Sequence, residues 1–243
     1  MADFEIKNGV AIIPEGVTVI NEEAFYYRTD LTYVMIPEGV TEIGKCAFFG
    51  CSNLTSIVIP ASVTEIGESA FADCSRLSNI LVAVENKVYD SRNNCNAIIK
   101  TSENKIVLGC ASTVIPESVT EIGPRAFEKN YRLNNILFPS NMTTIGDYAF
   151  SGCTGLTCLI IPENVNKIGE GAFEGCTCLN NIQVSKGNKS YYSCLEQGGN
   201  MISALIPGVG TWSWNSNGCN MCGYRCQGYR CNSEICQGKQ HRL

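Results

Sequence analysis

A segment of 23 residues recurs in register along most of this chain, and it constrains the fold more than any other feature. The copy at residues 36–58 reads IPEGVTEIGKCAFFGCSNLTSIV, and similar copies begin at Ile59 and at Ile115. Self-similarity at a fixed period of about 20 to 50 residues indicates a solenoid or an array. Six prolines keep the spacing of 23, in two sets of three: Pro14, Pro37, Pro60 and Pro116, Pro139, Pro162.

Each copy contains signals for two short extended segments and a turn. Residues 54–59 are rich in β-branched side chains and precede Pro60, which cannot donate a ladder hydrogen bond and therefore ends the strand. Residues 63–66 form a second extended piece, and residues 68–72 are expected to make about one helical turn. We expect a positive φ at the glycine between them, because Asn replaces it in the first copy: Gly44, Gly67, Gly123, Gly146, Gly169.

A single copy cannot fold alone. It buries roughly five large apolar side chains, each contributing about 1.5–3 kcal/mol. Ordering each of its residues costs about 1.5 kcal/mol. Only stacked neighbours, which cover the open faces of the core, can make the repeat stable.

The repeat resembles the bacterial BspA-like leucine-rich repeat, whose signature is LxxIxIPxxVxxIGxxAFxxC, over about residues 10–184. The resemblance implies a right-handed solenoid, a horseshoe with a concave parallel β-sheet and short helical or 3-10 turns on its convex side. It also implies a family of interaction and adhesion modules rather than enzymes.

The repeats are interrupted once and then end. Pro60 and Pro116 are 56 residues apart, so an insertion of 33 residues lies between them. We predict a β-hairpin within it, because apolar residues 97–99 and 106–108 flank a polar turn at 102–105. The predicted organisation is an N-terminal cap (1–12), repeats (13–81), an irregular hairpin insertion (82–114), repeats (115–183), a degenerate second insertion or C-terminal cap (184–210) and a Cys-rich tail (211–243).

The insertion is echoed after the second set of repeats. ILVAVENKVYDS from Ile80 resembles IQVSKGNKSYYS from Ile182, and both keep an N-K-x-Y core at an offset of 102 residues. The chain therefore has a longer period that combines regular repeats with one irregular unit.

The sequence lacks the residues that several classes of function require. The one histidine, His241, lies three residues from the end of the sequence, so the repeats contain no base that could activate a nucleophile. No phosphate-binding loop is present, and we expect neither an enzyme nor a cofactor. The net charge is −5 without a basic stripe, and no stretch approaches 18 apolar residues, so we expect neither nucleic-acid binding nor membrane insertion.

The 15 cysteines fall into a repeat column, scattered positions and the tail. We expect the column to be a ladder of buried free thiols that hydrogen-bond the backbone weakly: Cys51, Cys74, Cys153, Cys176. The tail could hold zinc, disulfides or no fixed structure, and its candidate zinc ligands begin with a CxxC pair: Cys219, Cys222, Cys226, Cys231.

The compartment is predicted from the thiols and from the start of the sequence. Many unpatterned cysteines favour a reducing environment, and MADFEIKNGV lacks the features of a signal peptide. We therefore expect a cytoplasmic protein, with the cell surface or secretion as the alternative if a leader has been removed.

Outward-facing positions on the predicted sheet provide the candidate binding surface. One outward column is polar and the other is apolar, and contiguous exposed apolar area usually marks a contact site. The alternative is that apolar residues simply suit strands, or that a hairpin covers them. The first hypothesis is protein binding on the concave face, with a glycan as a second ligand class; the other is metal or redox function of the tail. The candidate binding residues are Tyr33, Met35, Val58, Asn79, Leu81, Asn135, Leu137, Ile160, Asn181 and Gln183.

Overall fold

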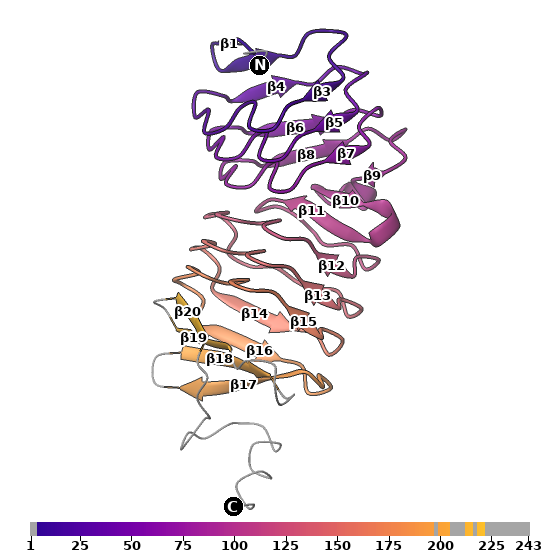
Figure 1. Cartoon of the computed structure of the whole chain (residues 1–243). Helices are drawn as coiled ribbons and strands as arrows, with labels where there is room; N and C mark the ends of the chain where they lie inside the picture. Colours follow the sequence, from indigo (N-terminus) through magenta and orange to yellow (C-terminus); the bar gives the residue numbers. More distant parts are fainter. Residues whose placement is uncertain (1–3, 197–198, 205–211, 216–217, 222–243) are drawn as a thin grey trace, which may run out of the picture.

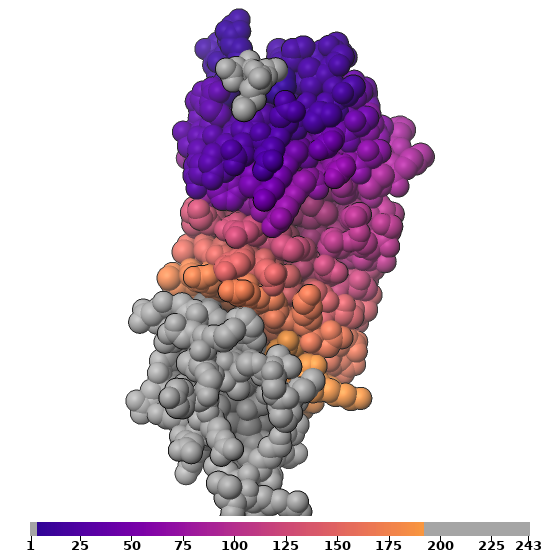
Figure 2. All heavy atoms as spheres, viewed as in Figure 1, coloured from indigo at the N-terminus to yellow at the C-terminus, as the bar shows by residue number. Residues whose placement is uncertain are grey.

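The protein is an elongated stack of coils, each about one repeat long (Figure 1). This computed structural model describes residues 4–196, 199–204, 212–215 and 218–221, with side chains described for residues 4–191. In the space-filling view, the colours follow one another in bands along the stack, because each coil contacts mainly its neighbours in sequence (Figure 2). The predicted repeat solenoid is confirmed.

The first face of the solenoid, called the strand face below, is made of parallel strands that precede each repeat proline or its equivalent. In the C-terminal half it includes the parallel pair β14 (Cys158–Ile161) and β16 (Asn181–Val184). At the N-terminal end, β1 (Ile6–Lys7) closes the sheet by antiparallel pairing. The parallel strands of this face in the N-terminal half are, in order, β2 (Val10–Ile12), β4 (Tyr33–Met35), β6 (Ser56–Ile59) and β8 (Asn79–Val82).

The second face carries strands of two residues each, and within each set of repeats consecutive strands pair in parallel. They form one sheet in the N-terminal half and continue a second sheet in the C-terminal half. The strands are β3 (Val19–Ile20), β5 (Glu42–Ile43) and β7 (Glu65–Ile66), then β12 (Glu121–Ile122), β13 (Thr144–Ile145) and β15 (Lys167–Ile168).

The third face, called the turn face, consists of consecutive turns and contains no helix within the described repeats, so the predicted helical turn is wrong. Alternate N–H groups of the first, second, fourth and fifth coils donate to carbonyls of the next coil, which a helix could not allow. In the second coil the pairs are Cys46 to Glu68 (3.0 Å), Phe48 to Ala70 (2.7 Å) and Gly50 to Ala72 (2.9 Å). Each coil has a left-handed residue at two positions of this ladder. The first position holds Glu23, Cys46, Ser69, Arg125, Tyr148 and Gly171. The second position holds Tyr27, Gly50, Asp73, Lys129, Gly152 and Gly175.

The repeat glycines do not have the predicted positive φ, and that prediction is also wrong. They permit a close approach between coils instead. A Cβ atom added to Gly44 would lie 2.5 Å from the Glu22 nitrogen and 2.9 Å from the Ile20 carbonyl oxygen of the preceding coil. Asn21 is tolerated at the same position of the first coil because β3 is the edge strand of its sheet.

The close approach predicts how Gly44 responds to substitution. Gly44→Asn should lower the free energy of unfolding by about 1–3 kcal/mol, because the new side chain overlaps the backbone of the preceding coil. Gly16→Asn is the control, since Gly16 has a φ of +86° and open space around it, and Asn tolerates that conformation. Urea denaturation of both variants measures the difference. Equal losses would mean that crowding against the preceding coil does not select glycine at position 44.

Stacked aromatic rings and thiols fill the interior. Phe4, Phe25, Phe48 and Phe71 stack in sequence with ring centroids 4.9–5.3 Å apart. A second ladder in the C-terminal half contains Phe127, Phe150 and Phe173 at 5.0 and 5.6 Å. The predicted thiol column is confirmed: the Sγ atoms of Cys51, Cys74, Cys153 and Cys176 donate to backbone carbonyls at 3.0–3.3 Å, and all four side chains are buried.

The insertion divides the interior into two hydrophobic cores. It contains β9 (Tyr89–Asp90), η1 (Arg92–Asn94), β10 (Ala97–Lys100), η2 (Thr101–Glu103) and β11 (Lys105–Gly109). Strands β10 and β11 form the predicted antiparallel hairpin. One face of the hairpin contributes Ile98 and Leu108 to the N-terminal core, and the other contributes Ile99 and Ile106 to the C-terminal core. The hairpin is therefore a wall between them.

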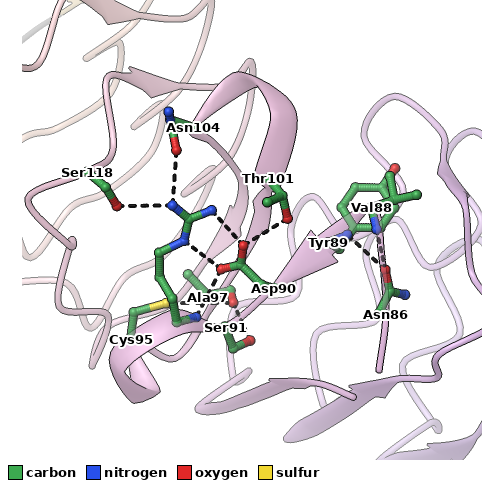
Figure 3. Close-up of polar contacts among 11 residues, drawn as sticks. Asn86, Val88, Tyr89, Asp90, Ser91, Cys95, Ala97, Thr101, Asn104 and Ser118 are labelled. Carbon is green, nitrogen blue, oxygen red and sulfur yellow. Dashed lines mark hydrogen bonds and ion pairs between the residues drawn. The ribbon is translucent and has the colours of Figure 1, made fainter. Parts of the chain in front are cut away.

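The N-K-x-Y motif closes the second-face sheet of the N-terminal half. The buried Asn86 side chain donates to the Pro60 and Val63 carbonyls, both at 2.9 Å. Its Oδ1 atom accepts the N–H groups of Val88 (2.9 Å) and Tyr89 (2.8 Å), as Figure 3 shows. The Tyr89 hydroxyl then accepts the N–H of Ile66 on the edge strand β7 at 3.0 Å.

The second copy of the motif repeats this network, which confirms the echo seen in the sequence. Asn188 donates to the Pro162 and Val165 carbonyls at 2.7 and 2.9 Å. Tyr191 accepts the N–H of Ile168 on β15 at 3.0 Å. Each N-K-x-Y motif thus ends a second-face sheet with a tyrosine hydroxyl in place of another strand.

An ion pair within the insertion is linked by one hydrogen bond to the repeat that follows it. The Arg92 guanidinium makes a bidentate contact with Asp90, at 2.8 and 2.6 Å, and also donates to Asn104 and Ser118 (Figure 3). The Thr101 hydroxyl donates to Asp90 at 2.8 Å. These contacts hold the two short 3-10 helices of the insertion against the next coil.

The C-terminal part adds two antiparallel hairpins to the stack. The first pairs β17 (Tyr191–Glu196) with β18 (Gly199–Ala204), and the second pairs β19 (Trp212–Asn215) with β20 (Gly218–Met221).

Candidate interaction surface

Aliphatic side chains form a straight column on the strand face. Strand pairing places Ile12 opposite Met35 and Val58 opposite Leu81, so these side chains point the same way from adjacent strands. In the C-terminal half, Ile160 lies opposite Gln183, which ends the apolar column. The exposed fractions are 63% for Ile12, 50% for Met35, 41% for Val58, 44% for Leu81, 73% for Val114, 71% for Leu137 and 51% for Ile160. These side chains belong to neither core.

The predicted polar column lies beside it. Tyr33 and Asn181 are partly buried, whereas Asn79 and Asn135 are exposed, as is Gln183 in the apolar column. The structure therefore places all ten sequence-predicted residues on one face and brings them into two adjacent columns. The alternative that a described hairpin covers the apolar column is wrong, because its members are at least 41% exposed.

Two members of the column, Ile12 and Val114, were missing from the sequence-based set. Each lies two residues before a repeat proline, Pro14 and Pro116, which is the offset of Met35 from Pro37. The signal was therefore present. Ile12 belongs to the cap region and Val114 is the last residue of the insertion, so neither lies in a regular copy of the repeat.

The column is interrupted at the level of the insertion. Asn93, Asn94 and Asn96 have positive φ values of 58°, 52° and 56°, which turn the backbone there. The Asn96 side chain donates to the Ser78 carbonyl at 2.8 Å, and its Oδ1 atom accepts the N–H of Ile80 at 2.6 Å. The strand face thus carries two apolar rows, an N-terminal row of four residues (Ile12, Met35, Val58, Leu81) and a C-terminal row of three (Val114, Leu137, Ile160).

A pocket of about 340 Å³ hollows the surface beside the C-terminal row. Leu137 and Ile160 line it together with Phe138 and Pro162, and Glu163 and Ser185 supply polar groups. The pocket gives this half of the strand face a concave apolar site with a polar edge, which is the usual composition of a contact site.

The buried thiols offer no alternative reactive site. Burial raises the pKa of Cys51 and of Cys176 to about 12, and it raises the pKa of Cys74 and Cys153 as well. The thiolate is the reactive form, so these side chains are unreactive at neutral pH. Two other free thiols, Cys158 and Cys178, are exposed.

The described residues contain no group of three His, Cys, Asp or Glu side chains that could hold a metal ion. The alternative zinc ligands are not among them: Cys222, Cys226 and Cys231 lie outside the described residues, and only the backbone of Cys219, in β20, is described. Nor does the described part of the chain include a helix that is long and apolar enough to cross a membrane.

Known proteins provide independent comparisons. A family model for the BspA type leucine rich repeat region matches residues 7–106 and again residues 107–209. A solved leucine rich cell surface protein from Faecalibacterium prausnitzii is 29% identical, with a TM-score of 0.53; the similarity covers 72% of this chain and 59% of that one. None of the curated proteins matches the chain significantly.

Two further solved structures share the fold. The pneumococcal vaccine antigen PcpA is 20% identical, with a TM-score of 0.59 and coverage of 74% of this chain and 52% of that one. A leucine-rich repeat protein from Eubacterium ventriosum is 24% identical, with a TM-score of 0.52 and coverage of 74% and 61%. The chain therefore spans between 52% and 61% of the length of these three relatives.

Proposed function

Because the chain belongs to the BspA-type leucine-rich repeat family, we propose that it is a non-catalytic adhesion module that binds a protein partner on its strand face. The observation that carries this proposal is the pair of exposed apolar rows. Seven aliphatic side chains, each at least 41% exposed, form these two rows on one face of the stack. Contiguous apolar area of this kind usually marks a contact site.

The surroundings of the rows favour a protein partner. The polar column next to them supplies amide and hydroxyl groups, including Tyr33, Asn79 and Asn135, which can form the hydrogen-bonded edge of an interface. The net charge of −5 disfavours a polyanionic partner. The pocket beside Leu137 and Ile160 can accept a protruding side chain, which is how interfaces concentrate their binding energy.

Introducing one carboxylate into each apolar row tests the proposal. The double variant Leu81→Glu and Leu137→Glu should reduce partner binding by at least about tenfold, because charges are excluded from the centre of an interface. Its melting temperature should stay within about 2 °C of the wild-type value, since both side chains are exposed. Surface-protein extracts passed over immobilised protein, with quantitative mass spectrometry, measure the binding.

The matched control is Val19→Glu plus Tyr26→Glu, which adds the same charge at exposed positions outside the strand face, on the second face and on the turn face. Proteins retained by the wild type and by this control, but not by the double variant, are the expected result. Equal retention by all three proteins would remove the strand face from consideration. A lower melting temperature of the double variant would mean that the rows stabilise the fold.

The compartment is part of the same proposal. We propose that the protein is displayed at the cell surface, because its relative from F. prausnitzii is described as a cell surface protein. The nine cysteines whose side chains the structure describes are free, but the four of the repeat column are buried and have raised pKa values, so an oxidising environment would leave them unchanged. Brief protease treatment of intact source cells should remove the protein; full protection would place it in the cytoplasm.

A further inference from the structure

The turn face has a gap where the N-terminal repeats meet the insertion. In the second coil, alternate N–H groups donate to the coil that follows. Their equivalents in the third coil are the N–H groups of Ser69, Phe71 and Asp73, and these have no acceptor among the residues that the structure describes. Phe71 and Asp73 are buried, with exposed fractions of 4% and 8%. A buried N–H group without an acceptor is rare in folded proteins, so these donors call for a partner.

A cavity of about 160 Å³, called the junction cavity, lies at this gap. It is lined by residues 67–72 of the third coil and by residues 123–125, which begin the corresponding turn of the next repeat. Gly109 of the insertion replaces part of the coil that is missing between these two turns, since its N–H donates to the Ala126 carbonyl of the next repeat at 2.9 Å. The N–H groups of Ser69 and Phe71 therefore belong to a segment that lines the cavity, on the side where the first, second, fourth and fifth coils donate to the coil that follows.

Charged and apolar side chains complete the lining. Lys100 and Lys105 both pair with Glu103, so these three side chains keep a net charge of +1. Arg125 also lines the cavity and is paired with Glu128 at 2.7 Å, and Glu68 is exposed at its edge. The apolar part of the lining includes Ile66, Val107 and Leu108. The charges of Lys100, Lys105 and Arg125 are balanced by those of Glu68, Glu103 and Glu128, so it is the free N–H groups that favour an anion here.

We propose that the junction cavity binds a carboxylate carried on a small apolar group. The carboxylate oxygens accept hydrogen bonds from the N–H groups of Ser69 and Phe71, next to the lysine pair. The apolar group contacts Val107 and Leu108. A free small carboxylic acid and the C-terminal residue of a peptide both present this chemistry. The site is on the turn face and does not depend on the proposed function of the strand face.

Amide NMR of the full ¹⁵N-labelled chain tests the site. Isovalerate represents a free carboxylate and N-acetylleucine a peptide end, while isovaleramide has the shape of isovalerate without its charge. Both carboxylates, or one of them, should shift the amide signals of Ser69 and Phe71 with saturation. The equivalent amides of Cys46 and Phe48 are the internal control, because they already donate to Glu68 and Ala70.

A pair of lysine variants tests the charge. Lys105→Met should weaken the binding of the carboxylate about fivefold. Lys45→Met, which removes an exposed lysine from the preceding coil, should leave the binding unchanged. Binding of both carboxylates would identify a free acid as the ligand class, and binding of N-acetylleucine alone would identify a peptide C-terminus.

Three results would overturn the proposal. The first is the absence of any shift at Ser69 and Phe71 with either carboxylate. The second is an equal shift with isovaleramide, which would exclude a role for the charge and requires no variant. The third is tighter binding of inorganic phosphate than of both carboxylates, which would replace the ligand class.

Discussion

Phe150→Ala is expected to unfold the C-terminal half of the solenoid under conditions in which the N-terminal half stays folded. Phe150 is fully buried and stacks between Phe127 and Phe173, at 5.0 and 5.6 Å. Its truncation leaves a cavity in the middle of the aromatic ladder and should cost about 3–5 kcal/mol. The loss should remain local, because the β10–β11 hairpin separates the two cores.

Phe48→Ala is the mirror-image experiment, since Phe48 stacks between Phe25 and Phe71 at 4.9 and 5.1 Å in the other core. Hydrogen exchange measured by mass spectrometry reports the protection of each half separately. Phe49→Ala is the control, because Phe49 lies outside both cores and contacts Tyr26 and Tyr27. If each substitution lowered protection equally in both halves, the solenoid would be one cooperative unit and the wall would not separate it.

Asn86→Ala should be the most damaging substitution of a polar residue, with a loss of about 3 kcal/mol in the free energy of unfolding. The buried side chain makes four hydrogen bonds, so its removal leaves two backbone carbonyls and two N–H groups without partners. It also frees Tyr89, whose hydroxyl closes the edge of β7. Urea denaturation followed by circular dichroism measures the loss.

Two asparagine variants provide the comparison for Asn86→Ala. Asn188→Ala should cause a similar loss in the C-terminal half, because Asn188 makes the same contacts. Asn53→Ala should cost less than about 1 kcal/mol, because the two hydrogen bonds of the Asn53 side chain, donated to Thr29 and accepted from Arg76, lie at the surface. A loss for Asn86→Ala no larger than that for Asn53→Ala would mean that the N-K-x-Y motif is not a structural closure.

The features that depend on the period could be predicted from the sequence. The strand that precedes Pro60, the thiol column at Cys51 and the hairpin around residues 102–105 are all as predicted. The strand and the thiol column follow from physical constraints within one repeat or between adjacent repeats, and the hairpin follows from a local pattern within the insertion. A proline ends a strand, a buried column needs side chains of one size, and a polar turn joins two apolar segments.

The turn face could not be predicted in the same way. Its left-handed positions hold residues such as Glu23, Cys46 and Tyr148, whose own preferences do not favour a positive φ. The hydrogen bonds between coils override those preferences. The prediction for the repeat glycines was wrong because glycine suits both a positive φ and a close backbone approach. The sequence alone does not distinguish these two roles.

The candidate site was predicted in outline only. The alternation of side chains in a strand was enough to place Val58 and Leu81 on the outer surface. It could not reveal the interruption at Asn93 and Asn94, because that depends on how the insertion folds. The junction cavity was not predicted either, since it arises from a missing coil and not from a motif.

The wall formed by β10 and β11 makes the length of this protein adjustable. A block of 102 residues contains one set of repeats, one closing N-K-x-Y motif and, in its first copy, a hairpin that starts the next core. Duplication of such a block would insert a complete unit without exposing an unfinished sheet or requiring a new cap. Gene duplication could therefore lengthen the array one whole block at a time, and each product would already be able to fold.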